Sequence, residues 1–154
     1  MTPEEKARQK IDQWFSDAGW KVVDRDEYEP TCTAVAIREG LLKGNLEADY
    51  FLFINGKAVG VLEAKREETD AFSDKVCNQA VLYARNVPRI YQTYQKPLPF
   101  IFTSNGKDLY FCDFRKQDSC FNQIMTIPTP YELVKLLGIN DYFAGLPTCE
   151  KRIT

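Results

Sequence analysis

The sequence contains no histidine, and this absence removes the most common general base from its possible chemistry. Catalysis by Ser-His-Asp or Cys-His groups is excluded, and so are zinc sites built on histidine. If the protein performs a reaction, carboxylates, lysine, tyrosine or a hard metal ion must carry it.

Cysteines are few, and long apolar runs are missing. The five cysteines are odd in number, scattered and never spaced as Cys-x-x-Cys. This pattern favours reduced thiols in a cytoplasmic protein over a disulfide framework or a metal cluster. No apolar run reaches membrane-spanning length and no signal peptide precedes the first expected helix, so we expect no membrane association.

The charge is nearly balanced, with a formal net charge of −2. The absence of a strong basic field counts against a free-standing DNA-binding protein, because phosphate binding draws on lysine and arginine. It leaves room for a small site whose DNA is held mostly by other domains. The hydrophobic fraction of 44% and the charged fraction of 27% are those of an ordinary globular protein.

Local signals predict three helices. The first has Thr2 as its N-cap and Pro3 as its first residue, and it ends near Gly19. The second runs from about residue 73 to 86, and the third covers 133–137 after a second capping signal at 129–132.

Apolar segments between these helices predict strands and hairpins. Strands are expected at 20–23 and 34–37, loops at 24–30 and 40–45, and hairpins at 46–67 and 99–114. The order of elements predicts one α/β domain over residues 1–154, with helices flanking a mixed sheet.

The first hairpin, LEADYFLFINGKAVGVLEAKRE, is apolar except at one end. Asp49 opens its first strand, whereas Glu63 and Lys65 close the second and share a face. A charge at the end of a strand covered on both faces needs a partner or an ion. Two carboxylates suit Mg²⁺, and a neighbouring lysine suits hydrolysis of a phosphodiester. The alternative is a salt bridge between Lys65 and Glu63, Asp49 or Glu67.

A regular hairpin would not support the metal site. A two-residue turn at Asn55-Gly56 would set Asp49 opposite Leu62, with Asp49 and Glu63 on opposite faces of the sheet. The metal site therefore requires a slip of one residue, through a bulge near Gly60, a longer turn, or a bend at Asp49.

The charged residues resemble the D…E-x-K core of the PD-(D/E)XK nuclease superfamily, and residues 79–83 resemble the Q-x-x-x-Y motif of one of its branches. The fuller resemblance is to the N-terminal nuclease domain of the restriction (R) subunit of type I restriction-modification enzymes. It covers most of the chain, through Glu5-x-x-Arg8-x-x-Ile11-Asp12, Ala18-Gly19-Trp20, Arg38-Glu39, Ala48-Asp49-Tyr50, Val61-Leu62-Glu63-Ala64-Lys65-Arg66, Gln79 to Tyr83 and Pro99 to Gly106.

The resemblance implies a restriction-endonuclease-like core that cleaves double-stranded DNA with Mg²⁺. Asp49 and Glu63 would bind the metal, and Lys65 would act near the attacking water. Glu5 is a further candidate metal ligand, for which the alternative is a capping box with Thr2.

The same resemblance gives two roles to the middle helix. Gln79 and Tyr83 lie one helical turn apart and share a face. They would contact the DNA backbone or brace the site. The alternative is an ordinary helix surface with a core tyrosine.

The resemblance further implies methyltransferase and specificity subunits as partners. The sequence has no G-x-x-x-x-G-K-[ST] loop and no helicase motif, so ATP use would belong to a translocase elsewhere in a longer subunit. Two other interpretations stay open: a repair or resolvase-type nuclease of the same fold, and a non-catalytic domain that binds other subunits.

Overall fold

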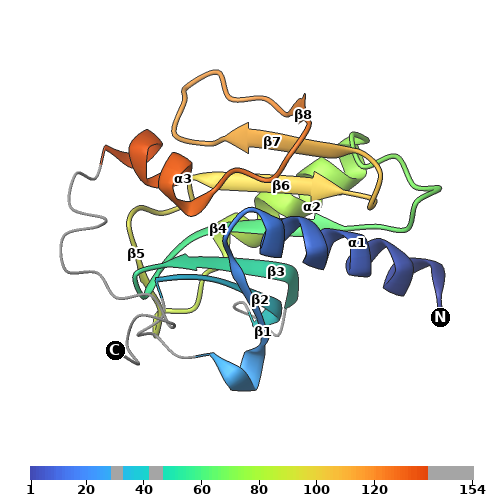
Figure 1. The fold of residues 1–154 in the computed structure, drawn as a ribbon. Helices are drawn as coiled ribbons and strands as arrows, with labels where there is room; N and C mark the ends of the chain where they lie inside the picture. Colours follow the sequence, from blue (N-terminus) through green and yellow to red (C-terminus); the bar gives the residue numbers. More distant parts are fainter. Residues whose placement is uncertain (29–32, 42–46, 139–154) are drawn as a thin grey trace.

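The computed structural model describes residues 1–28, 33–41 and 47–138. Within these residues eight strands form one mixed sheet (Figure 1). The strands are β1 (Lys21–Asp24), β2 (Ala34–Leu41), β3 (Glu47–Ile54), β4 (Lys57–Ala64), β5 (Gln92–Thr93), β6 (Phe100–Ser104), β7 (Leu109–Asp113) and β8 (Asn122–Ile124). Seven of them follow the order β1-β2-β3-β4-β6-β7-β8, and β5 pairs with β4.

The sheet is mixed because only some neighbouring strands run the same way. The pairs β1–β2, β4–β5 and β4–β6 are parallel. The pairs β2–β3, β3–β4, β6–β7 and β7–β8 are antiparallel. Strand β4, which carries Glu63, is therefore central and lies between β3 and β6.

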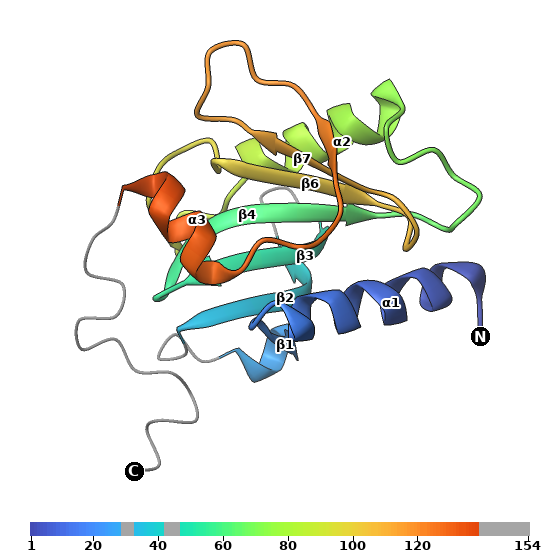
Figure 2. The ribbon, with the colours of Figure 1, turned by 45° about the horizontal axis from the view of Figure 1, so that its top comes forward.

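Helices cover both faces of the sheet (Figures 1 and 2). Helices α1 (Pro3–Asp17) and α3 (Pro130–Leu137) pack on the face that carries Tyr50 and Leu52. Helix α2 (Asp74–Arg85) packs on the opposite face, against Phe51 and Phe53. The predicted α/β fold, with helices flanking a mixed sheet, is confirmed.

The helix boundaries follow the capping signals in the sequence. Thr2 Oγ1 accepts a hydrogen bond from the Glu5 backbone N–H at 3.1 Å, and Pro3 is the first residue of α1. Gly19, with φ +95°, lies just beyond the C-cap of α1. A capping box joins Thr129 and Glu132 at the start of α3.

The observed strands differ from the predicted ones at several places. Strand β2 extends to Leu41, because residues 38–41 continue the ladder against β3, so Gly40 lies in a strand rather than a loop. The predicted loop at 24–30 contains a 3-10 helix, Arg25–Glu27. Residues 29–30 and 42–45 of the predicted loops lie outside the described residues. The short strands β5 and β8 were not predicted.

Two further expectations concern thiols and membranes. Cys77, Cys112 and Cys120 are free, as predicted, whereas Cys32 and Cys149 lie outside the described residues. In the part of the chain that the structure describes, no helix combines the length and apolarity needed to cross a membrane.

Candidate functional site

A β-bulge in the β3–β4 hairpin places Asp49 and Glu63 side by side. Leu52 pairs with Gly60, but the next residue, Phe53, pairs with Ala58, so β4 contains one extra residue. The pairing of Tyr50 with Leu62 then sets Asp49 opposite Glu63. The predicted one-residue slip near Gly60 is confirmed.

Gly60 fits this bulge because β6 approaches its backbone closely. A Cβ atom at Gly60 would lie 2.4 Å from the carbonyl oxygen of Phe100. Any larger residue would push β4 away from β6 at the point where the register shifts. The same strand pairing places Glu63 beside Thr103 of β6.

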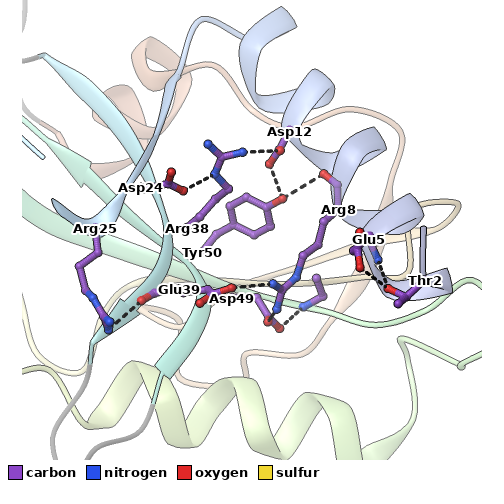
Figure 3. A network of polar contacts seen from close by, with 11 residues as sticks. Thr2, Glu5, Arg8, Asp12, Asp24, Arg25, Arg38, Glu39, Asp49 and Tyr50 are labelled. Atoms are coloured by element: carbon purple, nitrogen blue, oxygen red, sulfur yellow. Dashed lines mark hydrogen bonds and ion pairs between the residues drawn. The ribbon is translucent and has the colours of Figure 1, made fainter. Parts of the chain in front are cut away.

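Both carboxylate oxygens of Asp49 are engaged. Oδ2 accepts a hydrogen bond from the Ala64 backbone N–H at 2.7 Å. Oδ1 accepts a hydrogen bond from the guanidinium of Arg8, which comes from α1 (Figure 3). The Asp49 side chain is 14% exposed, so this ion pair is partly shielded from water.

Glu63 is the most buried acid of the site, with 3% of its surface exposed. Burial, followed by the hydrogen bond and charge of Asp49, raises the pKa of the Glu63 carboxyl to about 9. Lys65 opposes this rise, since its Nζ lies 3.5 Å from Glu63 Oε2. Burial and the neighbouring Asp49 thus disfavour ionisation of Glu63, and a further cation at this site would favour it.

Helix α2 completes the site. Lys65 Nζ donates to Gln79 Oε1 at 3.3 Å, and Gln79 Nε2 donates to Tyr83 Oη at 2.8 Å. Burial and the nearby charge of Glu63 raise the pKa of Tyr83. Gln79 therefore uses both ends of its amide to connect Lys65 with Tyr83. A role of these two residues in bracing the site or in contacting DNA stays a prediction.

The connection between β4 and α2 is held by Asn105, a residue without a predicted role. Its Nδ2 donates to the carbonyl oxygens of Glu67 and Thr69 at 3.2 and 2.9 Å. Its Oδ1 accepts from the backbone N–H groups of Lys107 and Asp108. This buried amide fixes the chain that leaves Lys65. In the sequence, Asn105 is marked only by its place in the predicted hairpin turn and in the 99–106 stretch of the family resemblance.

Arg8 is the main residue of the site to which sequence reasoning gave no role. Besides Asp49, its guanidinium donates to Glu39 Oε1 at 3.0 Å. Burial disfavours the charged form, but the two carboxylates together raise the pKa of Arg8. Arg8 and Glu39 are among the residues that carry the family resemblance, yet no spacing in the sequence indicates that they meet.

A second polar cluster fixes α1 on the sheet beside this ion pair (Figure 3). The buried Tyr50 hydroxyl lies 2.5 Å from Asp12 Oδ1 and 3.1 Å from the Arg8 carbonyl oxygen. Arg38 forms ion pairs with Asp12 and Asp24, both at 3.0 Å. These contacts position the turn of α1 from which Arg8 extends.

Glu5, the third candidate metal ligand, lies at the start of α1. The Thr2 hydroxyl donates to Glu5 Oε1 at 3.1 Å, so in this structure the carboxylate serves the end of the helix. Arg8, one turn further along, is the α1 residue that contacts Asp49. A role for Glu5 at a metal stays a prediction.

The carboxylate pair suits a hard divalent cation. Among the described residues, no group of three or more His, Cys, Asp or Glu side chains is placed to hold a metal. Mg²⁺ commonly uses only one or two carboxylates and completes its octahedron with water and phosphate oxygens. The mutual repulsion of Asp49 and Glu63 is the feature that a cation would relieve.

A comparison with known families places the chain in a restriction enzyme. Residues 35–119, more than half of the chain, match the family described as type I restriction enzyme R protein N terminus. The chain belongs to this family. The matched stretch includes Asp49, Glu63 and Lys65. It also includes Gln79 and Tyr83 of α2. The family assignment favours the restriction enzyme over the repair and resolvase alternatives.

A solved structure is similar over nearly the whole chain. It is a fragment assigned to an HsdR subunit of a type I restriction enzyme from Vibrio vulnificus YJ016. The TM-score is 0.56 at 22% sequence identity, and the match covers 90% of this chain and 26% of that one. At this identity the similarity shows the shared fold. None of the curated proteins matches the chain significantly.

Proposed function

We propose that this chain is the nuclease part of a type I restriction enzyme R subunit and hydrolyses phosphodiester bonds of double-stranded DNA with Mg²⁺. The observation that carries the proposal is the convergence of Asp49 and Glu63, produced by a bulge that an ordinary hairpin would not need. Lys65 lies on the same face, with its Nζ 3.5 Å from Glu63. A salt bridge alone does not require the second carboxylate.

Asp49 and Glu63 would hold the Mg²⁺ ion. When bound, the metal would polarise the phosphoryl group and lower the pKa of a bound water. Lys65 is positioned between Glu63 and Gln79, where its ammonium group can orient the attacking water or contact the phosphate. Gln79 and Tyr83 keep Lys65 in this position.

The proposed partners are those of the whole enzyme. The chain spans 26% of the related HsdR chain, so the remaining functions belong to other segments and subunits. We propose that methyltransferase and specificity subunits select the DNA and that an ATP-driven translocase delivers it. The net charge of −2 agrees with a domain that does not hold DNA on its own.

The proposal is tested with Glu63→Gln in a complete R subunit assembled with its partner subunits. We expect cleavage of supercoiled plasmid to fall by about 100-fold or more, because one metal ligand is lost. ATP hydrolysis should be unchanged. Glu67→Gln, an exposed acid on the following connection, is the matched control and should cleave normally. Normal cleavage by Glu63→Gln would refute the assignment.

A further inference from the structure

Arg8 is bonded to the Asp49 oxygen that carries no backbone hydrogen bond. The backbone N–H of Ala64 holds Oδ2 of Asp49, and this donor cannot leave without disturbing the end of β4. Oδ1 carries no backbone hydrogen bond, so it is the freer oxygen for an incoming cation, and the guanidinium of Arg8 is bonded to it. A guanidinium and a divalent cation cannot both stand against this oxygen without strong repulsion.

We propose that Arg8 competes with the divalent cation for Asp49 and so sets the metal affinity of the site. This inference rests on the proposed function, since it takes Asp49 as a metal ligand. Arg8 is a positioning residue in this view: it acts through Asp49 and neutralises that carboxylate while the metal is absent. The metal binds only when the guanidinium moves aside.

Glu39 gives the displaced guanidinium a second partner. Arg8 Nη1 lies 3.0 Å from Glu39 Oε1, while Nη2 is directed to Asp49, so one arginine joins both carboxylates. The Glu39 side chain is 58% exposed, and it can follow the guanidinium outward. Arg8 can therefore leave Asp49 without losing every counter-charge.

The backbone at Glu39 supports this role. Glu39 has φ +56° inside β2, a conformation that residues other than glycine rarely adopt. Strain of this kind persists where surrounding contacts require it, and it clusters at functional sites. In this conformation the Glu39 carboxylate accepts a hydrogen bond from Arg8 (Figure 3).

The test measures Mn²⁺ binding to the 154-residue chain by calorimetry. Arg8→Met removes the competing charge and keeps an apolar stem, so we expect Mn²⁺ to bind about ten-fold tighter or more, given the strength of charged hydrogen bonds. Arg8→Gln should also tighten binding, and it serves if the methionine variant does not fold. Arg8→Lys keeps the charge and should remain close to the wild type.

Lys10→Met is the matched control. Lys10 lies on the same helix and pairs with Glu67 at 3.7 Å, with both side chains more than half exposed. Its loss changes the net charge by the same amount, but leaves Asp49 untouched. We expect its Mn²⁺ affinity to stay within about two-fold of the wild type, since exposed charges are well screened.

Glu39→Gln provides a change of opposite sign. Without its second partner Arg8 should hold Asp49 more tightly, so Mn²⁺ should bind about three-fold to ten-fold more weakly. In the Arg8→Met background most of this effect should disappear, because the competitor is gone. A double-mutant cycle over the two positions measures this coupling.

The outcomes separate the inference from the function on which it rests. If Asp49→Asn abolishes Mn²⁺ binding but Arg8→Met leaves it unchanged or weaker, the competition is wrong and the metal site stands. If none of the variants binds Mn²⁺ at this site, the proposed metal site fails and the inference with it. Tighter binding in Arg8→Met and Arg8→Gln, together with the Glu39 coupling, would establish the competition.

Discussion

The protonation of Glu63 depends on its burial and on the neighbouring Asp49 and Lys65. Burial and Asp49 raise its folded-state pKa to about 9 from an ordinary value of 4.5. Between pH 4.5 and about 9, Glu63 therefore keeps its proton in the folded chain but loses it in the unfolded chain. The contribution of Glu63 to the unfolding free energy is fully present below about pH 4.5 and declines as the pH rises toward 9.

We therefore expect Glu63→Gln to stabilise the metal-free chain at alkaline pH. The wild type should lose at most about 1.4 kcal/mol of unfolding free energy per pH unit across this window. Glutamine imitates the protonated acid and removes the dependence. Urea unfolding in EDTA at pH 5.5 and pH 8.5 measures the difference. If the unfolding free energy depends on pH equally in both proteins, Glu63 ionises in the folded chain without loss of stability. That result would favour the simple salt bridge with Lys65.

At the scale of elements, α2 contacts the end of β4 through the side-chain amide of Gln79, which bonds to Lys65 and Tyr83. Within the described residues, Gln79→Ala would leave the Lys65 ammonium group with its contact to Glu63, and it would remove the hydrogen bond between the amide and the Tyr83 hydroxyl. We expect cleavage by the complete enzyme to fall about ten-fold, because Lys65 loses its fixed position.

Calorimetry with Mn²⁺ distinguishes the two roles proposed for this helix. Gln79 contacts Lys65 rather than either carboxylate, so Mn²⁺ affinity should change little in Gln79→Ala. Asn78→Ala, an exposed neighbour on α2, is the control for both measurements. Loss of Mn²⁺ binding in Gln79→Ala would mean that the amide supports the metal ligands themselves.

The β3–β4 hairpin shows how far sequence reasoning reaches. Unbroken apolar runs and the Asn55-Gly56 turn predict both strands, and Asn55 has the expected positive φ of 56°. The bulge is not visible in these runs, because both faces of the strands are buried and no alternation of apolar and polar residues marks the register. It was inferred from the chemistry, since two carboxylates on opposite faces could not share an ion.

The remaining parts of the site lie beyond local patterns. Asp49, Glu63, Lys65 and Gln79 come from consecutive elements, and their meeting follows from strand order. Arg8 is 41 residues from Asp49, and its contact depends on how α1 lies across the sheet. No periodicity within a helix specifies such a crossing, so Arg8 was found only in the structure.

At the scale of the whole molecule, α1 is seated on the rest of the fold through a close contact with the β6–β7 turn. A Cβ atom at Gly106 would lie 2.8 Å from the Cα atom of Ala7, and Gly106 has φ +83°. We expect Gly106→Ala to lower the unfolding free energy by about 2–4 kcal/mol, from backbone strain and displacement of α1.

Gly138→Ala separates these two contributions. Gly138 has a similar φ of +74° at the end of α3, but none of the described residues lies within 4 Å of a Cβ atom at this position. Its substitution should cost about 1 kcal/mol, from the backbone alone. Equal losses in the two variants, measured by urea unfolding, would show that α1 can shift without cost.

The packing of α1 on the sheet limits where the chain can be truncated for expression. The family match begins at residue 35, after α1 and β1. A protein expressed from that residue would lack Ile11, Phe15 and Trp20, which cover Tyr50 and Leu52 in the core. The apolar face of the sheet that α1 covers would then be exposed to water, which promotes aggregation. The border of sequence similarity therefore lies inside the folding unit, and expression should start upstream of α1.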